Sequence, residues 1–461
     1  MDYSDFLAKK RQVDPVTGIL NPTNLNKNLF DFQQHVVTIA LKRGREALFA
    51  GTGMGKTVME LSYAEKVLEH TNKDVLIITP LSVAHQFIDE GEKFGIEVKR
   101  AHSESDISGG KSIYVTNYQK LHHFDLSRFS GVVLDESGIL KNETGKYRTA
   151  LIDSTKDIPF RLPATATPAP NDFMELGNHA QFLGIMSYTD MLSTFFTHDA
   201  GDTAKWILKG HGEPMFWRWM ATWSLMFQNP SDLGFDGSKY ILPPLHYHNH
   251  SVKVDYAPNI DTGFLFPMEA QSMDEKRSAT KSTLQERCEL AAEITTGIKR
   301  PVVVWCNLND EGDLLEKLIP GAKQVKGSDS DEKKEEILHS FSSGELQYLI
   351  SKTSICGWGM NWQHCSDTVY VGLNDSFEQI YQSIRRFWRF GQKREVNAHF
   401  ISSPLEGKII ANIRRKQKQA EHMMDQMVEH MRDIQLQNIH GTFRNIAEYN
   451  ANQKIILPQW I

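Results

Sequence analysis

The stretch that most constrains the fold is AGTGMGKT, residues 50–57, which stands between two apolar runs. The preceding EALFA has the composition of a short buried strand, and the following KTVMELSYAEKVLEH has the apolar spacing of a helix. Glycines at positions 51, 53 and 55 let the backbone curl so that its N–H groups face one anion. A helix N-terminus adds positive potential at the same place. The sequence therefore predicts a phosphate-binding loop at a strand-to-helix turn.

The side chains of this stretch fit the same site. Lys56 would reach the outer phosphates of a nucleotide, and Thr57 would ligate Mg²⁺. Ala50 replaces the glycine of the strict pattern, which is a mild departure. The cofactors implied are ATP and Mg²⁺, and the competing interpretation is a plain glycine turn. We expect the phosphates to be cradled by Gly51, Thr52, Gly53, Met54 and Gly55.

Two parts of the chain alternate short β-branched runs with amphipathic runs, which is the pattern of parallel α/β sheets. The first, residues 30–185, holds the strand candidates EALFA, DVLIITP, SIYVTNY, GVVLDES and FRLPATATP. The second, residues 284–403, holds PVVVWCN, LQYLISK, TVYVGLN and VNAHFIS. We therefore predict an α/β protein with two parallel-sheet lobes in tandem.

A carboxylate pair follows the phosphate loop. Asp135 and Glu136 end the apolar run GVVLD, and side chains at such positions emerge at the carboxyl edge of a parallel sheet. Asp135 is suited to hold Mg²⁺ through water, and Glu136 is suited to polarise an attacking water. A lone Asp-Glu pair is weak evidence, but at a strand end downstream of a phosphate loop it predicts nucleotide hydrolysis.

The segment between the two α/β parts is aromatic and irregular. Residues 190–283 include Trp206, Trp217, Trp219 and Trp223, followed by YILPPLHYHNH, and we interpret them as a helical insert and a linker. Aromatic rings can stack on bases, but this spacing is more often core packing, which we favour. After residue 404 the pattern predicts a helical extension, and we expect the apolar end KIILPQWI to dock back on the body.

Composition limits the class of protein. The net charge is −6, so a site for a polyanion must be a local patch. The four cysteines form no C-x-x-C pair, which favours free thiols in a reducing compartment over a zinc site or a disulfide framework. The acidic N-terminal sequence is not a signal peptide, and the apolar runs are too short to span a bilayer. We expect a cytoplasmic monomer.

Further segments stand in a distinctive order around these motifs. They are LFDFQQHVV at residues 29–37, LDESGILKN, LPATATPAPND, and SKTSICGWGMNWQHC with the following QSIRRFWRFGQKR. In this order they resemble the Swi/Snf-type ATP-dependent DNA translocases of helicase superfamily two. The resemblance covers residues 29–403 and implies two RecA-like lobes with a nucleotide between them.

In the first lobe, the resemblance implies roles for residues beyond the phosphate loop. Gln33 is expected to read adenine, and Thr165 and Thr167 are expected to couple the ATP state to the grip on DNA. Ser137 and Gly138 depart from the family, because they replace its Ala-His. This departure leaves the phosphate and Mg²⁺ groups intact.

In the second lobe, the resemblance implies that Gly359 and Asn361 contact the nucleotide and that Gln382 couples the lobes. Arg386 and Arg389 are expected to cross the cleft and neutralise charge on the γ-phosphate. Taken alone, RRFWRFGQKR is better interpreted as a solvated basic surface, but its register with Gln382 favours the catalytic interpretation. Some of these cations could contact DNA phosphate instead.

Contacts to DNA are expected at strand ends of both lobes and mostly to the backbone, which makes them salt-sensitive and sequence-tolerant. Each candidate could equally be a plain strand-end turn. The candidates are Pro80, Thr116, Asn117, Asn142, Lys352 and Thr353.

We therefore predict a lead-in at residues 1–28, an ATP-binding lobe at 29–189, the aromatic insert and linker at 190–283, a second lobe at 284–404 and a helical extension with a docking tail at 405–461. The predicted function is a DNA-dependent ATPase that translocates on duplex DNA and remodels or anneals branched DNA in replication, recombination or repair.

Two alternatives remain open. One is a strand-separating helicase acting on DNA, with RNA less favoured. The other is a weakly hydrolysing ATP-dependent switch or scaffold on DNA. The compact chain carries no visible chromatin-reading, nuclease or zinc module, which favours a bacterial or phage protein that works with a separate nuclease or replication protein.

Overall fold

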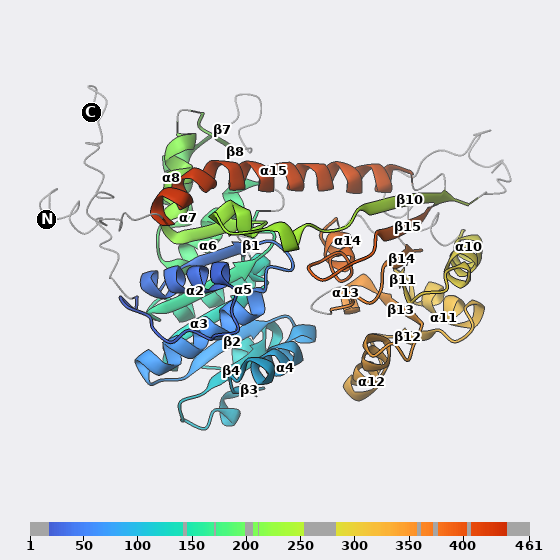
Figure 1. Cartoon of the computed structure of the whole chain (residues 1–461), viewed down its shortest axis with the longest axis horizontal. Coiled ribbons are helices and arrows are strands. Elements are labelled where there is room, and N and C mark those ends of the chain that lie inside the picture. The colour runs from blue at the N-terminus through green and yellow to red at the C-terminus, as the bar shows by residue number, and fades with distance from the viewer. Residues whose placement is uncertain are drawn as a thin grey trace, which may run out of the picture.

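The computed structural model describes residues 18–141, 145–169, 172–198, 206–210, 212–252, 283–356, 361–371, 377–402 and 407–439. Two parallel sheets form two lobes that lie side by side, and a long C-terminal helix runs along them (Figure 1). The predicted docking tail and most of the predicted lead-in lie outside the described residues. Among the described helices, none is long and apolar enough to cross a bilayer.

The first lobe is built on a seven-stranded sheet in the order β3-β4-β2-β5-β6-β1-β9, with parallel pairing throughout. Helices cover its faces, so the central strands are buried on both sides, as apolar runs without alternation predict. The strands are β1 (Ala47–Ala50), β2 (Val75–Thr79), β3 (Val98–Arg100), β4 (Ile113–Asn117), β5 (Gly131–Asp135), β6 (Phe160–Thr165) and β9 (Ser224–Phe227). The helices are α2 (Asp31–Arg43), α3 (Lys56–Thr71), α4 (Ala84–Phe94), α5 (Lys146–Thr155), α6 (Leu176–Leu183), α7 (Tyr188–Phe195) and α8 (Glu213–Trp223).

The second lobe is built on a six-stranded parallel sheet in the order β10-β15-β14-β11-β13-β12. Its strands are β10 (Leu245–Ser251), β11 (Val302–Cys306), β12 (Lys323–Val325), β13 (Tyr348–Lys352), β14 (Asp367–Tyr370) and β15 (Val396–Ser402). Its helices are α10 (Leu284–Gly297), α11 (Asn309–Leu318), α12 (Asp331–Ser342), α13 (Thr353–Cys356) and α14 (Phe377–Ile384). The four cysteines are buried in this lobe as free thiols.

The predicted fold class is confirmed, and every strand candidate in the sequence contains a strand of the structure. The segment 190–252 differs from the helical insert that we expected. It supplies α8, the antiparallel pair β7 (Phe196–His198) and β8 (Trp206–Leu208), and an edge strand for each large sheet, β9 and β10. Sequence patterning missed these edges because β9 is short and β10 alternates histidine with other residues rather than apolar with polar.

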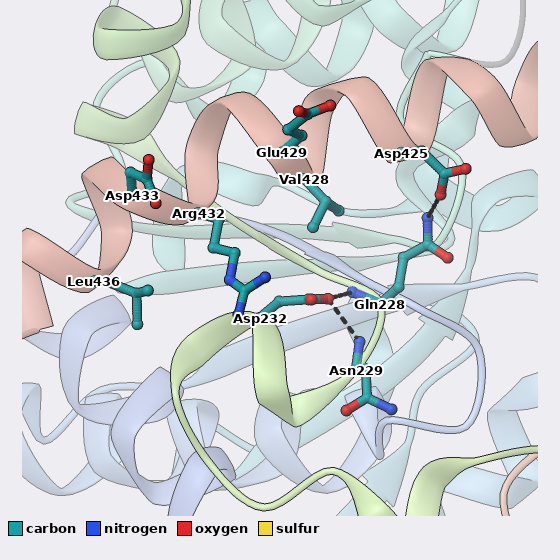
Figure 2. Close-up of a pocket in the computed structure, with 9 residues that line it drawn as sticks. All are labelled: Gln228, Asn229, Asp232, Asp425, Val428, Glu429, Arg432, Asp433 and Leu436. Atoms are coloured by element: carbon teal, nitrogen blue, oxygen red, sulfur yellow. Dashed lines mark hydrogen bonds between the residues drawn. The ribbon is translucent and has the colours of Figure 1, made fainter.

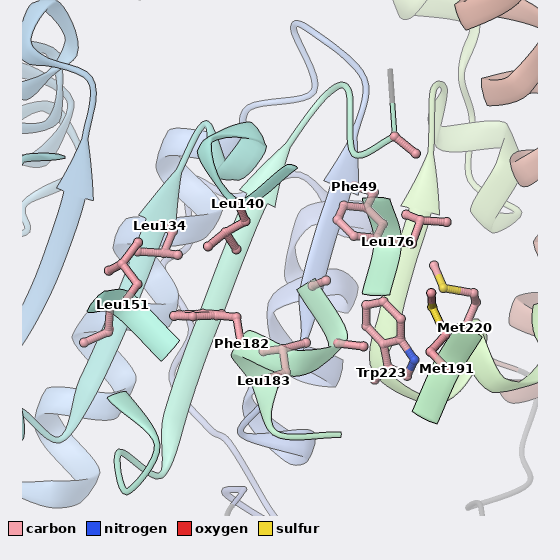
Figure 3. Packing of buried hydrophobic residues seen from close by; sticks show 14 of the residues in the cluster. Phe49, Leu134, Leu140, Leu151, Leu176, Phe182, Leu183, Met191, Met220 and Trp223 are labelled. Carbon is pink, nitrogen blue, oxygen red and sulfur yellow. The ribbon is translucent and has the colours of Figure 1, made fainter. Parts of the chain in front are cut away.

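The tryptophan cluster is core packing, as favoured from its spacing. Trp217, Trp219 and Trp223 on α8 are each 1% exposed. Trp223 packs edge-on against Phe49 of β1, with ring centroids 6.2 Å apart, and Figure 3 shows it among Met191, Met220 and Leu176. These rings anchor the segment after β6 to the strand that leads into the phosphate loop, and they are buried too deeply to stack on bases.

The C-terminal helix α15 (Gly407–Ile439) leaves the second lobe and packs on the first. Met423, Met427 and Met431 enter the core beside α8. The Gln435 side chain accepts from the backbone N–H of Met226 (3.0 Å) and donates to its carbonyl (3.0 Å), so it satisfies the free edge of β9 as another strand would. Figure 2 shows the same helix over Gln228, whose amide donates to Asp425 (3.3 Å).

Histidines line the junction of β10 and β15. The ring of His399 stacks on those of His248 and His250, with centroids 4.7 and 5.3 Å apart, and its Nδ1 lies 3.0 Å from Nε2 of His250. Burial, with a smaller contribution from His248 and His250, lowers the pKa of His399 to about 4, although Asp367 opposes the shift. The folded protein therefore keeps His399 neutral in a pH range where the unfolded chain protonates it.

This shift predicts an acid-dependent loss of stability. The contribution of neutral His399 is fully present above the ordinary histidine pKa and is lost as the pH falls toward 4. Between pH 7 and pH 5, the Tm of the native protein should fall by about 2–4 °C more than that of the His399→Gln variant. Thermal unfolding followed by circular dichroism at both pH values measures the difference, and parallel curves would contradict the expectation.

Candidate functional site

The phosphate loop has the geometry that its glycines allow. It joins β1 to α3, and Gly53 and Gly55 adopt φ angles of +88° and +80°, in the left-handed region. A Cβ at Gly55 would lie 2.3 Å from Nε2 of Gln33, and one at Gly53 would lie 2.8 Å from the backbone nitrogen of Phe390. Both conformation and space therefore require glycine, and the second lobe reaches the loop directly.

Lys56 lies where charges of both lobes meet. Its Nζ donates to the carbonyl of Ala50 at 3.1 Å, across the base of the loop. Burial lowers the pKa of Lys56 and Arg389 of the second lobe acts in the same direction, whereas Glu136 and Asp135 oppose the shift. The lysine is thus held near two carboxylates and a cation from the opposite lobe, which is the environment of a phosphate-binding lysine.

Gln33 is tied to the loop by its side chain. Its Nε2 donates to the carbonyl of Met54 (2.9 Å), and its Oε1 accepts from the backbone N–H of Phe30 (3.0 Å). This buried amide fixes the start of α2 against the phosphate loop. A base read by Gln33 would therefore lie next to the phosphates.

Asp135 and Glu136 stand at the carboxyl end of β5. Thr79 donates to Oδ2 of Asp135 (2.8 Å), and burial together with Glu136 raises the pKa of Asp135 to about 7. Glu136 adopts a φ of +51°, which is unusual for a residue with a side chain and is typical of strain at functional sites. Thr165 donates to Oε2 of Glu136 at 3.4 Å, and the backbone N–H of Thr167 donates to Thr165 (3.1 Å).

These residues fit a magnesium nucleotide. Within the described ranges, no group of three His, Cys, Asp or Glu side chains is arranged to hold a metal on protein ligands alone. Mg²⁺ in nucleotide sites takes one or two protein oxygens and completes its shell with phosphates and water. Buried Asp135, with its raised pKa, is a carboxylate that a divalent cation would stabilise in the charged form.

Arg386 and Arg389 of the second lobe face the first-lobe site. Burial and nearby Arg389 lower the pKa of Arg386 to about 10, and Glu136 and Asp135 oppose that shift. Arg386 donates to the backbone carbonyl of Gln382 (3.0 Å) and to its Oε1 (3.2 Å). Burial also lowers the pKa of Arg389, and its Nε has no hydrogen-bond partner among the described residues. The site therefore holds buried positive charge that an anion would satisfy.

The loop that carries these arginines is braced by two glutamines. Nε2 of Gln392 donates to the carbonyls of Gln363 (3.0 Å) and Cys365 (2.9 Å), and Gln363 donates to the carbonyl of Phe390. Gly391, which stands between Phe390 and Gln392, has a φ of +92°. The Gly-Gln pair that the sequence shows after the arginines thus fixes the loop rather than contacting a ligand.

Two further residues of the motif segments, Ser137 and Trp388, have their own partners. Ser137, which replaces the family's alanine, is buried with its Oγ 3.1 Å from Nε2 of His179 on α6. Trp388 stands between the two arginines and donates to the carbonyl of Pro243 (2.6 Å), on the segment that joins the lobes. The Ser137 contact stays within the first lobe, and the Trp388 contact ties the arginine loop to the joining segment.

Of the predicted DNA contacts that the structure describes, three are buried and two are partly exposed. Thr116 and Asn117 are 2% and 3% exposed at the end of β4, and their burial argues against a DNA-facing role in this conformation. Thr353 is also buried and donates to Gln379 (3.0 Å), whereas Pro80 and Lys352 are partly exposed. A polar residue at a strand end was the only signal for these sites, and it does not distinguish a ligand contact from a buried turn.

Three other predicted residues have no contact to the site among the described residues. Gly359 and Asn142 fall outside the described residues. Asn361 begins the next described segment and is exposed. Thr57 follows Lys56 in the first turn of α3, where a magnesium ligand of this loop is expected.

Sequence reasoning missed Glu60. It lies one helical turn after Lys56 on α3, is fully buried, and neither carboxylate oxygen has a hydrogen-bond partner among the described residues. Burial raises the pKa of Glu60 well above its ordinary value, Asp135 adds to the shift, and Lys56 opposes it. A glutamate in an otherwise apolar helix face was the available signal, and its spacing from Lys56 places both on one side of the helix.

Comparison with known protein families adds an independent finding. The family described as SNF2-related domain matches residues 32–205, and the family described as helicase conserved C-terminal domain matches residues 285–391. Together these two domains indicate an ATP-hydrolysing, helicase-like enzyme of superfamily two. Within that superfamily, the chain belongs to the SNF2-related family.

Solved structures resemble the chain over most of its length. The Sulfolobus solfataricus SWI2/SNF2 ATPase core in complex with dsDNA is 18% identical, with 90% of this chain and 96% of that chain covered and a TM-score of 0.43. S. cerevisiae Dbp5 bound to RNA and ADP BeF3 is 11% identical, with 86% and 93% covered and a TM-score of 0.55. The second likeness supports the two-lobed fold. No curated protein matched in sequence.

Buried Glu60 makes a testable contribution to stability. Because the folded protein favours the protonated acid, the unfolded chain gives up the proton more readily, and stability is lost as the pH rises above the ordinary glutamate pKa. Glu60→Gln removes the ionisation and should raise Tm by about 2–6 °C at pH 8 but much less at pH 5. Calorimetry of both proteins at both pH values tests this, and a gain that does not depend on pH would contradict it.

Proposed function

We propose that the protein is a DNA-dependent ATPase that couples ATP hydrolysis to movement along duplex DNA. The observation that carries the proposal is the position of Arg386 and Arg389, which belong to the second lobe but share an electrostatic environment with Lys56, Asp135 and Glu136 of the first. Groups split in this way between two lobes act together only when the lobes are closed.

Each group has a role in this proposal. Lys56 and the loop amides bind the phosphates, and Thr57 and Asp135 would hold Mg²⁺, which neutralises phosphate charge when bound. Glu136 lies beside Asp135 at the strand end and orients the attacking water. Arg386 and Arg389 neutralise the negative charge that develops on the γ-phosphate. Duplex DNA that contacts both lobes would favour closure, so DNA binding and hydrolysis become coupled.

A series of hydrogen bonds in the first lobe supports this coupling. Thr165 at the end of β6 contacts Glu136, and its Oγ1 also accepts from the backbone of Thr167. A change at the γ-phosphate that shifts Glu136 would therefore reach the segment after β6. In the second lobe, Gln382 holds Arg386, and its Nε2 has no hydrogen-bond partner among the described residues.

The choice of duplex DNA rests on the family and on the sequence motifs. The SWI2/SNF2 core from Sulfolobus solfataricus was solved with dsDNA, and Dbp5 was solved with RNA. We propose backbone contacts from partly exposed strand-end residues such as Lys352, and activity on branched DNA as the biological use. ATPase rates compared across single-stranded, duplex, forked and four-way DNA and RNA test this, and strand displacement on a fork would favour the helicase alternative.

Arginine substitution tests the closed-site mechanism. Arg389→Ala should retain ATP binding but lose about 10³-fold in DNA-stimulated turnover, because a cation is removed only from the transition state. Arg385→Ala is the matched control, since Arg385 stacks over the rings of Tyr381 and Trp388 in the same segment. Steady-state ATPase with duplex DNA and equilibrium binding of a fluorescent ATP analogue provide the two measurements.

Lys56→Ala should abolish both ATP binding and turnover, because it removes the cation that lies at the phosphate loop. If native protein and Lys56→Ala are equally inactive with every nucleic acid, the motor proposal is wrong and the switch or scaffold alternative gains support. If Arg389→Ala turns over ATP at the native rate, the proposal fails at the second lobe.

A further inference from the structure

A cluster of basic side chains lies at the end of the first sheet that is far from the phosphate loop. Arg100 is the last residue of β3, and His102 follows it. His85 lies in the first turn of α4, and Lys120 belongs to the short helix η3 (Tyr118–His123) after β4. Figure 1 shows β3, β4 and α4 together at one end of the lobe. We call these four residues the histidine–cation cluster. Its two histidines are exposed, and its two cations are partly exposed.

Each cation of the cluster is held by a histidine rather than by a carboxylate. Nη1 of Arg100 lies 2.6 Å from Nε2 of His85, and Nζ of Lys120 is hydrogen-bonded to Nδ1 of His102. Because arginine and lysine only donate hydrogen bonds, both ring nitrogens accept and both histidines are neutral. Among the described residues, neither cation forms an ion pair with an acidic side chain. The positive charge of the cluster is therefore uncompensated.

Other cations at this end of the sheet do have acidic partners. Lys99, which precedes Arg100 on β3, lies 3.5 Å from Glu97, and Arg128 forms an ion pair with Glu104. A protein with a net charge of −6 has enough carboxylates to pair every exposed cation. Accessible positive charge that stays unpaired on such a protein is a local patch that attracts an anion.

The cluster shares one edge of the sheet with the nucleotide site but does not overlap it. Because the sheet is parallel, the carboxyl ends of β3, β4, β5 and β1 all lie at this edge. In the strand order, β3 is three strands from β5, which ends at Asp135, and five strands from β1, which precedes the phosphate loop. At about 4.8 Å between neighbouring strands, these separations are about 15 Å and about 24 Å. An anion bound by the cluster is thus a different group from the phosphates of ATP.

We propose that the histidine–cation cluster is a second anion site of the first lobe, which binds phosphates of the DNA backbone. The inference rests on the proposed function and deepens it, because it names residues that hold duplex DNA on the first lobe. Thr116 and Asn117 at the end of β4 are buried, and Lys120, which follows them in the chain, supplies the accessible charge that they lack. Contacts to phosphate carry no sequence information, so the site accepts any sequence.

The histidines hold the cations in place until phosphate replaces them. Arg100 and Lys120 each exchange a neutral ring nitrogen for a charged phosphate oxygen, which makes a stronger hydrogen bond. The exchange needs no change in the backbone, since only side chains move. A polyanion with repeated phosphates engages both cations, whereas a single inorganic phosphate engages one.

The salt dependence of DNA binding tests the site. Each phosphate contact contributes about 0.9 to the slope of log affinity against log salt concentration. The double variant Arg100→Ala with Lys120→Ala should therefore lower that slope by about 2 and weaken duplex binding by about 10- to 100-fold at about 0.1 M salt. Fluorescence anisotropy of a labelled duplex, titrated with the full chain across a series of KCl concentrations, measures both quantities.

Two further variants serve as controls for this experiment. Lys120→Arg keeps a cation at the same place and should bind the duplex as the native protein does. Lys99→Ala is the matched control, because Lys99 lies on the same strand but already has a carboxylate partner. Its slope should equal that of the native protein.

The release of His102 makes DNA binding depend on pH. The groups that face this ring are Lys120 of η3, Arg100 of β3 and Asp106 of the short helix η2 (Glu104–Asp106). Burial, Lys120 and Arg100 lower the pKa of His102, and Asp106 opposes the shift. A phosphate that neutralises the cations raises this pKa again, so the complex takes up a proton and binding strengthens as the pH falls below the ordinary histidine range. Between pH 7.5 and pH 5.5 the native protein should gain about 3- to 10-fold more affinity than His102→Gln.

The outcomes separate this inference from the function on which it rests. If the double variant keeps the native slope and affinity, the cluster does not hold DNA and the inference is wrong, while the ATPase proposal stands. If polyglutamate displaces the duplex from the native protein but binds the double variant weakly, and the salt slope is unchanged, the cluster takes an acidic polypeptide and the inference is also wrong. If the native protein binds no duplex at any salt concentration, the proposed function falls and the inference falls with it. A slope that is lowered in the double variant and retained in Lys120→Arg and Lys99→Ala supports the site.

Discussion

The arrangement of the site depends on opposite charges buried where the two lobes meet. Lys56 and Arg386 supply positive charge that Asp135 and Glu136 oppose, and Arg389 adds a further cation near Lys56. Buried charges are costly unless they are paired, and removal of one partner leaves the other uncompensated. The second lobe is therefore held toward the phosphate loop by the same electrostatics that would bind a triphosphate. A magnesium nucleotide adds both signs of charge and so fits a site that already contains both.

The segments that cover the edges of the two sheets also help to position this site. A parallel sheet needs both faces buried and its edges protected. The edges nearest the joining segment are β9 and β10, which belong to opposite lobes although they are close in the sequence. Helix α15 then returns from β15 to β9, where Gln435 satisfies the strand edge. The lobes are thus connected twice, once through the segment between β9 and β10 and once through α15, and both connections reach the strand beside the phosphate loop.

Ser137 and the aromatic residues of the arginine loop contact different parts of the molecule. Ser137 is satisfied within its own lobe by His179. Trp388 bonds the joining segment at Pro243, and Phe390 stacks on Tyr240 of that segment. The arginine loop of the second lobe therefore contacts the joining segment through one hydrogen bond and one stacked ring pair.

The two-lobed α/β class, the phosphate loop, the carboxylate pair and the order of the motifs could all be predicted from the sequence, because each is a local pattern of residues close together in the chain. Glycines that need left-handed φ angles and apolar runs that need a buried strand carry their meaning without knowledge of the rest. Contacts between distant segments became visible only in the folded chain: Glu60 under the site, Tyr240 against Phe390, Gln435 along β9, and the burial of Thr116 and Asn117. These depend on contacts between segments far apart in the chain, and burial and charge at such contacts are set by the packing of the whole protein rather than by any local pattern.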